Sequence, residues 1–416
     1  MFDFNKILVN ELDEGMRHLP NFIDGFQSYI ADKGTPALYQ KWSGIFLVGA
    51  ALERKVWLRT AKGKLYPNQY IILVGPAGVG KSLCTSSVYD LLDELRTPET
   101  PFFIAPTSVT KASLIDGLAE AERRIVRPTE SPPVITFNSI TIIPNEFGVF
   151  LPSWEGDFMS TLTDLYDCGR YAETRRTSKI NINLPHTQLN LFSATTPAHL
   201  NGLLPEGAWE QGFMSRVLIC YSGESVHTDL FYLDGMDLAQ RGKLIADLKD
   251  IYKMYGEFTV EEDYKLALNA WAKSGGPPIP DHPKLMSYRV RRPAHILKLS
   301  MISSASNSSD KRITLDNFAE ALDWLVELET FMPDVFKSMR SGGDGSAIEE
   351  CWHYVYTVWM KKKEPVEEHK IITFLQERVP VHNIERILDV MQRAKLLEKK
   401  YTGAGTMGYE PKARKA

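Results

Sequence analysis

Cysteine is scarce in this sequence, and the few cysteines are scattered. The chain of 416 residues has 4 of them, at positions Cys84, Cys168, Cys220 and Cys351. None belongs to a C-x-x-C pair, so the sequence excludes a zinc ribbon, a zinc finger and a dense disulfide framework. We expect all four to be reduced, buried thiols.

Long apolar runs are also missing. The longest, such as Ile45 to Leu52, fall far short of the roughly 20 residues that a membrane-spanning helix needs. The N-terminal stretch carries acids where a signal peptide would carry basic residues. The sequence therefore predicts a soluble, intracellular protein with no membrane partner.

The composition is that of an ordinary globular protein. Hydrophobic residues make up 44% and charged residues 24%, with 28 glycines and 24 prolines, which excludes disordered, collagenous and coiled-coil classes. The net charge of −4 is unevenly distributed: the chain from Gly345 onward has 13 Lys and Arg against 10 Asp and Glu, or +3, which leaves −7 for the rest. The C-terminal end is the basic one.

The patterning predicts several folding units. Residues 1–65 have apolar residues at helical spacing, in Ile7 to Met16 and again in Tyr39 to Leu58. Residues 226–340 return to helical patterns, interrupted by the proline-rich stretch from Gly275 to Pro283, and read as a helical lid. Residues 341–346 are rich in glycine and serine, and we predict a linker there.

Between these helical regions, residues 66–225 alternate short apolar runs with helical segments. The runs are Gln69 to Val74, Phe102 to Ala105, Val134 to Phe137, Ile140 to Ile143, Leu189 to Ala194 and Val217 to Tyr221. This alternation predicts an α/β core with a mostly parallel sheet covered by helices.

The strongest chemical signal follows the first of these runs. The residues are Gly75, Pro76, Ala77, Gly78, Val79, Gly80, Lys81 and Ser82, followed by Leu83. They match the G-x-x-x-x-G-K-[ST] phosphate loop, with a predicted strand before it and a helical segment after it. Backbone N–H groups would cradle ATP phosphates, Lys81 would bind the β- and γ-phosphates, and Ser82 would ligate Mg²⁺. A glycine turn without nucleotide is the alternative.

An acidic residue after a neighbouring strand is the next requirement of such an ATPase. Glu146, which follows Ile140 to Asn145, is the candidate for polarising the attacking water. Asn145 stands where an Asp is common, so the metal would depend mainly on Ser82 and phosphate. The alternative is a solvated acid in a turn.

Thr195, at the end of the Leu189 to Ala194 run, is the candidate to sense the γ-phosphate or the attacking water, and Asn190 is a weaker one. Threonine before proline is also a common turn residue. Arg216 immediately precedes another buried run and would act on the nucleotide of a neighbouring subunit, unless it forms an intramolecular salt bridge. Arg291, in an arginine cluster that opens a helix, would approach the nucleotide from the lid, unless it belongs to a solvated face.

This ordered set resembles the AAA+ ATPases, in particular phage and prophage replication proteins in which a Leu-Tyr-Pro-Asn stretch, here Leu65 to Asn68, leads into the phosphate loop. The segments around Arg216 and from Arg291 to Leu299 are similar to the arginine finger and second sensor of minichromosome-maintenance helicases. The resemblance covers about residues 35–330. It implies an AAA+ core over 66–225 and a ring of subunits, expected to be a hexamer, with ATP between neighbouring subunits.

In such helicases a hairpin before the sensor strand points into the ring's channel. The matching interval here contains Arg170, Arg175, Arg176 and Lys179, which would contact single-stranded DNA through its phosphates. The alternative is a hairpin that packs on its own subunit.

Residues 347–416 show three helical patterns, Ala347 to Lys362, Val366 to Arg378 and Ile384 to Leu397, and then a hairpin pattern, which predicts a winged helix. Its third helix would present basic residues to duplex DNA and its wing would touch phosphates. These residues are Arg386, Arg393 and Lys395 in the helix, and Lys399, Lys400 and Lys412 in the wing. Winged helices also bind proteins, so a replication protein is the alternative partner.

The expected function is an ATP-driven, ring-forming DNA helicase or translocase of a phage or mobile element, acting in the host cytoplasm. The second hypothesis is a replication initiator or helicase loader that uses ATP as an assembly switch. A packaging motor is less favoured because no nuclease-like acidic cluster is evident, and a primase is unsupported because no zinc-ribbon cysteines are present.

Overall fold

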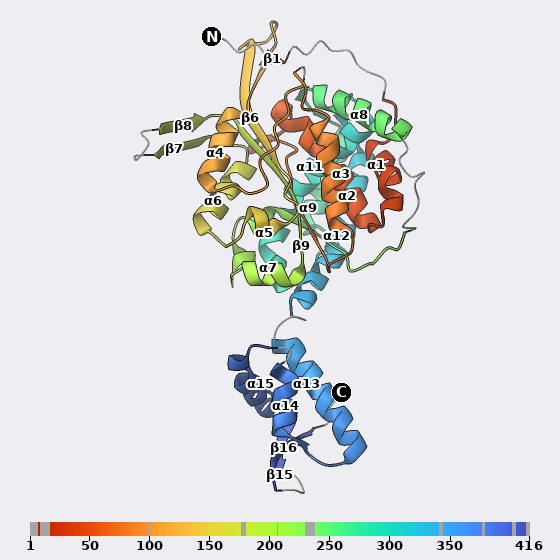
Figure 1. Cartoon of the computed structure of the whole chain (residues 1–416). Helices are drawn as coiled ribbons and strands as arrows, with labels where there is room; N and C mark the ends of the chain where they lie inside the picture. Colours follow the sequence, from red (N-terminus) through yellow and green to blue (C-terminus); the bar gives the residue numbers. More distant parts are fainter. Residues whose placement is uncertain are drawn as a thin grey trace. The chain divides into compact units, whose positions relative to one another are not determined.

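A computed structural model of the chain (Figure 1) describes residues 7–8, 17–98, 100–175, 180–205, 207–228, 238–340, 344–376, 379–401 and 405–412. The chain divides into two compact units, Met1–Pro333 and Asp334–Ala416. The division falls inside one long helix at Pro333. The predicted linker at 341–346 lies a few residues further on, and its residues 341–343 are outside the described part of the chain.

A six-stranded sheet forms the centre of the first unit. Its spatial order is β1 (Ile7–Leu8), β5 (Glu122–Val126), β6 (Val134–Ile142), β9 (Thr187–Thr195), β4 (Tyr70–Val74) and β10 (Val217–Tyr221). Neighbouring strands are parallel except for the antiparallel pair β5 and β6. The predicted α/β core with a mostly parallel sheet is thereby confirmed.

Helices surround this sheet (Figure 1). They are α1 (Phe22–Ile30), α2 (Ala37–Leu52), α3 (Lys81–Asp93), α4 (Lys111–Glu120), α5 (Phe147–Phe150), α6 (Gly156–Tyr166), α7 (Pro197–Leu203), α8 (Leu238–Lys253), α9 (Glu262–Lys273), α10 (Met286–Arg289), α11 (Arg292–Asn307) and α12 (Leu315–Arg340). Helix α2 packs against α1, α3, α8 and α11. Of its 16 residues 14 are buried, and most of these are apolar, the pattern expected of a central helix.

Smaller sheets complete the unit. β2 (Val56–Thr60) lies between β3 (Gly63–Leu65) and β11 (Gly256–Glu257), β7 (Tyr171–Arg175) pairs with β8 (Ile180–Leu184), and β12 (Thr259–Val260) pairs with β13 (Arg312–Ile313). The β7–β8 hairpin projects from the unit beside α4 (Figure 1).

The helical prediction for residues 1–65 is wrong at two places. Ile7–Leu8 form a strand that pairs with β5, while residues 9–16 are outside the described chain. The predicted helix to Leu58 ends at Leu52: Glu53 has a φ of 49°, outside the α-helical region, and a short 3₁₀ turn, Glu53–Lys55, follows. Residues from Val56 onward enter β2 because β-branched and aromatic side chains suit a half-buried sheet.

One strand, β6, replaces the two separate runs expected between Val134 and Ile143. The polar pair in its middle is buried and hydrogen-bonded: Asn138 Nδ2 donates to the Leu118 carbonyl at 3.1 Å, and Ser139 Oγ donates to Gln188 Oε1 at 3.1 Å. Buried polar side chains persist where such partners exist. A local polarity pattern therefore could not show that the strand continues.

The second unit has its own core and sheet. Its helices are α13 (Asp344–Lys362), α14 (Glu368–Gln376) and α15 (Val381–Arg393), and its antiparallel sheet has the order β14 (Val366–Glu367), β16 (Met407–Pro411) and β15 (Leu397–Tyr401). Cys351, Ile371, Ile387, Met391 and Tyr409 are buried together. The three helices and the hairpin that the sequence predicts are present, with the third helix starting three residues earlier than Ile384.

A buried ionic cluster connects the end of α2 to the sheet. Glu53 Oε1 lies 2.9 Å from Arg123 Nη2 and Glu53 Oε2 lies 3.6 Å from Lys55 Nζ, with all three side chains at most 1% exposed. Burial lowers the pKa of Lys55 to about 7, although the Glu53 carboxylate opposes this shift. Glu53 is thus the shared counter-charge of two buried cations.

We predict that Glu53→Ala destabilises the first unit by about 3–5 kcal/mol, because both cations would remain buried without an anion. Urea unfolding followed by tryptophan fluorescence measures the change. The matched control is Glu257→Ala, which removes the partner of Arg59 in a pair whose side chains are 36% and 70% exposed and should change stability little. Equal effects of the two substitutions would contradict the prediction.

Candidate active site

The phosphate loop of residues 75–80 leaves the carboxyl end of β4 and leads directly into α3. Gly78 and Gly80 have φ values of 83° and 78°, a region that favours glycine. A Cβ at Gly75 would lie 2.3 Å from the Ser222 carbonyl oxygen, and one at Gly80 would lie 2.7 Å from the Gly34 carbonyl oxygen. Three of the loop's glycines are therefore required by conformation or by close approach.

Tyr39, on α2, holds the loop from behind. Its hydroxyl oxygen lies 2.7 Å from the Val74 carbonyl and 2.9 Å from the Ser222 carbonyl, and it accepts from the Ser222 N–H at 3.1 Å. Burial raises the pKa of Tyr39 well above its usual value, so the hydroxyl stays protonated. One side chain thus joins the ends of β4 and β10. Sequence reasoning missed it, because nothing in the local pattern near residue 39 signals this distant contact.

Lys81 is 6% exposed and points back at the loop. Its Nζ donates to the Gly75 carbonyl at 2.8 Å and to the Pro76 carbonyl at 2.5 Å. Within the described chain no carboxylate lies within 4.0 Å of it. Burial lowers the pKa of Lys81, while the nearby Glu146 carboxylate acts in the opposite direction. A cation held by neutral carbonyls alone is suited to receive an anion.

Asn145 and Glu146 follow β6 at the same edge of the sheet, and both are exposed. The Asn145 amide oxygen accepts from Thr85 Oγ1 at 2.7 Å, which ties this turn to α3. Glu146 is the first residue before α5. Thr85 is a second contact that the motif did not predict, since it lies beyond the pattern's last position.

Thr195 ends β9 directly beside the loop. It pairs with Val74, its carbonyl accepts from the Gly75 N–H at 3.3 Å, and its buried Oγ1 has no partner in the described chain. Asn190 lies five residues earlier, where its Oδ1 accepts from the Gln69 N–H at 3.1 Å at the opposite end of β4. The weaker sensor assignment to Asn190 is therefore wrong, because the strand carries it away from the loop.

The parallel strands β4, β6 and β9 thus bring Lys81, Glu146 and Thr195 to one edge, the place where open α/β sheets bind ligands. These groups fit a nucleoside triphosphate with Mg²⁺: Lys81 has no counter-ion, Ser82 is exposed and the Thr195 hydroxyl has no partner in the described chain. Gly78 and Gly80, with positive φ, turn the loop around such a group. The described residues contain no group of three His, Cys, Asp or Glu that could hold a metal. Ser82 and phosphate oxygens would hold the ion.

Arg216 lies at the opposite edge. It precedes Val217, which pairs with Tyr70 at the start of β4, so about 16 Å of strand separates it from its own loop. The guanidinium is buried, 2.6 Å from Asp167 Oδ2 and 2.9 Å from the Gly212 carbonyl. The intramolecular salt bridge left open by the sequence is present. Asp167 has no sequence signal for this role.

Arg291 shares that carboxylate. Its Nη1 lies 3.5 Å from Asp167 Oδ1, because α10 packs against the short 3₁₀ turn that carries Arg216. The sequence predicts that Arg291 approaches the nucleotide from the lid, and the structure places it beside Asp167 and not at its own chain's phosphate loop. Two arginines instead form one cluster with Asp167 at the edge away from the phosphate loop.

No protein-family model matches the chain, and no curated protein is similar to it in sequence. No helix of the described chain has the length and apolarity to cross a membrane. The assignment of roles therefore depends on the geometry of the site itself.

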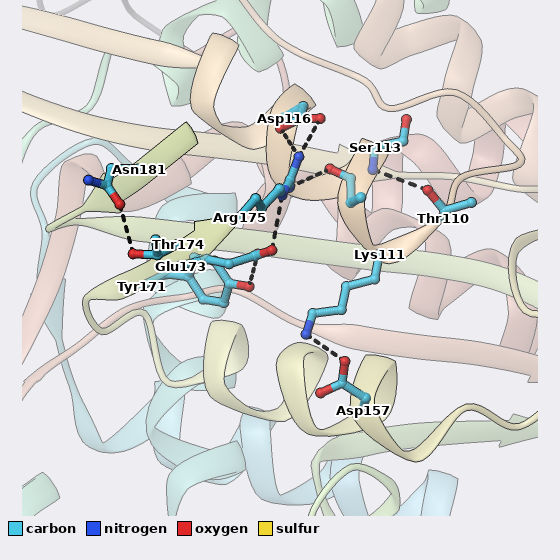
Figure 2. A network of polar contacts seen from close by, with 11 residues as sticks. Thr110, Lys111, Ser113, Asp116, Asp157, Tyr171, Glu173, Thr174, Arg175 and Asn181 are labelled. Atoms are coloured by element: carbon cyan, nitrogen blue, oxygen red, sulfur yellow. Dashed lines mark hydrogen bonds and ion pairs between the residues drawn. The ribbon is translucent and has the colours of Figure 1, made fainter. Parts of the chain in front are cut away.

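The hairpin's Arg175 already has partners on its own subunit (Figure 2). Its Nη1 lies 2.8 Å from Asp116 Oδ1 and its Nε 3.0 Å from Glu173 Oε1, and the side chain is 18% exposed. The pKa of Arg175 is raised, first by its hydrogen bond to Asp116 and second by its hydrogen bond to Glu173. Arg170 donates to Asn183 Oδ1 at 2.9 Å from an exposed position. Arg176 and Lys179 lie outside the described residues.

The basic residues of the second unit are also largely compensated. Arg393 lies 3.0 Å from Asp389, Lys399 3.1 Å from Glu368, Lys412 3.4 Å from Glu398, and Lys400 contacts Glu410. Arg386 has a partner as well. Lys395 follows α15 with a φ of 55°. The unit therefore presents mixed charge to a partner.

We predict that Arg175→Ala loosens the β7–β8 hairpin, because Asp116 and Glu173 would lose the cation that joins the hairpin to α4. Hydrogen exchange measured by mass spectrometry should show at least about tenfold faster exchange of the β7 and β8 amides. Arg170→Ala is the matched control, since it removes one exposed hydrogen bond within the hairpin. Unchanged exchange in Arg175→Ala would mean that the ion pairs do not hold the hairpin.

Proposed function

We propose that the protein is an ATP-driven, ring-forming DNA helicase or translocase with an AAA+ core. The observation that carries the proposal is the meeting of Lys81, Glu146 and Thr195 at the carboxyl edge of β4, β6 and β9, around a glycine loop that opens a helix. The setting in phage or mobile-element replication, in the host cytoplasm, rests on the resemblance alone.

Each residue of this edge has a proposed role. The loop N–H groups and Lys81 bind the triphosphate, Ser82 orients Mg²⁺, Glu146 takes the proton of the attacking water, and Thr195 Oγ1 positions that water or the γ-phosphate. Bound ATP with Mg²⁺ supplies the phosphoryl group and the charge that these donors stabilise. Lys81 leaves the Gly75 and Pro76 carbonyls for phosphate oxygens, since an anionic acceptor binds the ammonium group more strongly than a neutral carbonyl does.

The opposite edge supports assembly into a ring. Because β4 separates Arg216 from its own loop, this arginine can serve only a nucleotide bound by another subunit. Arg291 lies beside it and would act at the same boundary. A ring would place one subunit's loop against the next subunit's arginines, and these arginines would exchange Asp167 for the phosphate.

The replication initiator or helicase loader stays the second candidate, and the charge compensation of the second unit favours it. Lysines already paired with carboxylates release fewer counterions on binding DNA, so a protein partner suits this predicted winged helix at least as well. ATPase assays with and without single-stranded DNA, at two protein concentrations, test stimulation and assembly. Processive unwinding separates a helicase from a loader.

We predict that Lys81→Ala abolishes ATP hydrolysis and that Glu146→Gln keeps nucleotide bound but loses about two or more orders of magnitude in turnover. Only the second change spares the phosphate cradle. Steady-state ATPase and nucleotide-binding assays measure the two effects. The control is Glu155→Gln, an exposed glutamate before α6, which should behave like wild type. Near-normal turnover of Glu146→Gln would remove Glu146 as the base.

We predict that Arg216 acts in trans. Arg216→Ala subunits keep the phosphate loop, while Lys81→Ala subunits keep the arginine, so mixed rings contain some boundaries with both groups intact. Mixing the two inactive proteins should restore part of the hydrolysis, with a maximum at an intermediate ratio. A flat response across ratios, with mixing of subunits demonstrated independently, would count against action between subunits.

A further inference from the structure

A cavity of about 630 Å³ lies at the base of the β7–β8 hairpin, away from the phosphate loop. Its walls come from β2, β3, β5, the start of β6 and the turn after β8. The volume is within the usual range for sites that bind small organic groups. Its lining combines cations with aromatic rings, notably Arg54, Lys64, Trp57, Tyr66 and Tyr255.

The cations lie on the aromatic faces. Lys64 Nζ is 3.8 Å from the centre of the Trp57 ring, and the Arg54 guanidinium is 4.1 Å from that of Tyr66. Arg127, beside the cavity, lies 4.2 Å over Tyr255. Lys64 is exposed. Because exposed cation–π contacts contribute only about 0.5–1 kcal/mol, Lys64 can move to a phosphate and free the Trp57 ring for stacking.

Several donors here lack an anion. Outside the lining, buried Nε and Nη2 of Arg127 have no hydrogen-bond partner among the described residues. Lys64 forms no ion pair within 4.0 Å of Nζ there, although the Glu257 and Glu130 carboxylates act on it electrostatically. Glu130 is the acid in the lining, and it accepts a hydrogen bond from the Tyr255 hydroxyl at 3.0 Å. Lys55 also lines the cavity but is already paired with Glu53. The surplus of positive charge points to an anionic ligand.

Arg54 links the cavity to the hairpin. Its Nη1 donates to the Thr187 carbonyl at 3.0 Å and also to the Cys168 carbonyl, at the two ends of the segment that contains β7 and β8. Its Nη2 lies 3.4 Å from His186 Nδ1, in the turn between β8 and β9. A strand that follows the hairpin would therefore reach the cavity at its base.

We propose that this cavity binds single-stranded nucleic acid, with phosphates on Lys64 and Arg54 and a base on the Trp57 ring. Stacking platforms combined with a positive groove are the means by which proteins hold single strands without sequence preference. The choice of a nucleic-acid strand as ligand rests on the proposed function, whereas the anion-binding site itself rests on the contacts above.

The test is binding of fluorescent oligothymidylate, about 20 nucleotides long, to the full chain without ATP, followed by fluorescence anisotropy. Lys64→Glu should weaken binding about tenfold, because it replaces a phosphate contact by repulsion. Lys62→Glu is the matched control: it makes the same charge change two residues away, at an exposed position that does not line the cavity. Its binding should change less than about twofold.

The salt dependence provides a second measurement. Lys64→Ala should reduce the slope of log affinity against log salt by about 0.7, the value for one phosphate contact on a single strand, while Lys62→Ala should leave the slope unchanged. Trp57→Ala should weaken binding about tenfold by removing a stacked base. Circular dichroism spectra matching wild type show that each variant is folded.

Equal losses in the Lys64 and Lys62 variants would overturn the inference, since they would show only a general surface charge. Binding of thymidine monophosphate without binding of the oligonucleotide would overturn it as well. ATPase activity separates the binding inference from the proposed function. If DNA stimulates hydrolysis but the Lys64 and Lys62 variants bind the strand equally well, only the proposed role of the cavity is contradicted. Selective strand binding by a chain that does not hydrolyse ATP contradicts the proposed function alone.

Discussion

The pairing of β4 between β9 and β10 is the constraint on which the proposed chemistry depends. All five residues of β4 are buried, and their register is fixed from Tyr70, opposite Leu191 and Val217, to Val74, opposite Thr195 and Tyr221. A slip of one residue would turn each side chain to the other face of the sheet. The register therefore determines both what meets the phosphate loop and what lies at the far end.

Strand β4 separates the groups with proposed catalytic roles into two sets. The groups that would bind and attack a nucleotide gather at its carboxyl edge, and the cations that would stabilise transferred charge gather at its amino edge. In a single subunit the Asp167 carboxylate compensates the positive charges of Arg216 and Arg291, which would otherwise repel each other. Under the proposed function, such a chain has half of a site at each edge and would need a neighbour to complete it.

The sequence predicted best what is encoded locally. The strands β4, β9 and β10 are short apolar runs, and the glycine loop after β4 is a contiguous motif; the structure has a strand, a glycine loop and a helix where the pattern puts them. It failed where a distant partner decides the outcome. Asn190 bonds to the Gln69 backbone, and Arg291 shares Asp167 with Arg216. The contact of Arg175 with Asp116 on helix α4 is likewise invisible in the sequence, although it leaves the DNA prediction for Arg175 untested. None of these partners lies within the window in which periodicity is read.

The same limit explains the errors near residue 53. Helical spacing continues past Leu52, but the buried Glu53 must meet Arg123 and Lys55, and the chain turns there to let it do so. An ion cluster that joins three segments overrides a local preference for helix, since leaving any member unpaired costs more than the lost helical turns.

Helix α2 gives the two proposed sites a physical connection. Its first turn carries Tyr39, which holds the ends of β4 and β10 behind the phosphate loop, and Arg54 follows shortly after its last residue. The helix is about 24 Å long and is buried along most of its length, so it moves as a rigid body or not at all. A shift of the loop towards bound phosphate would therefore carry the Arg54 end with it, and with Arg54 both ends of the β7–β8 segment. Coupling of ATP to a strand at the hairpin then requires only that α2 has two stable positions, one for each nucleotide state.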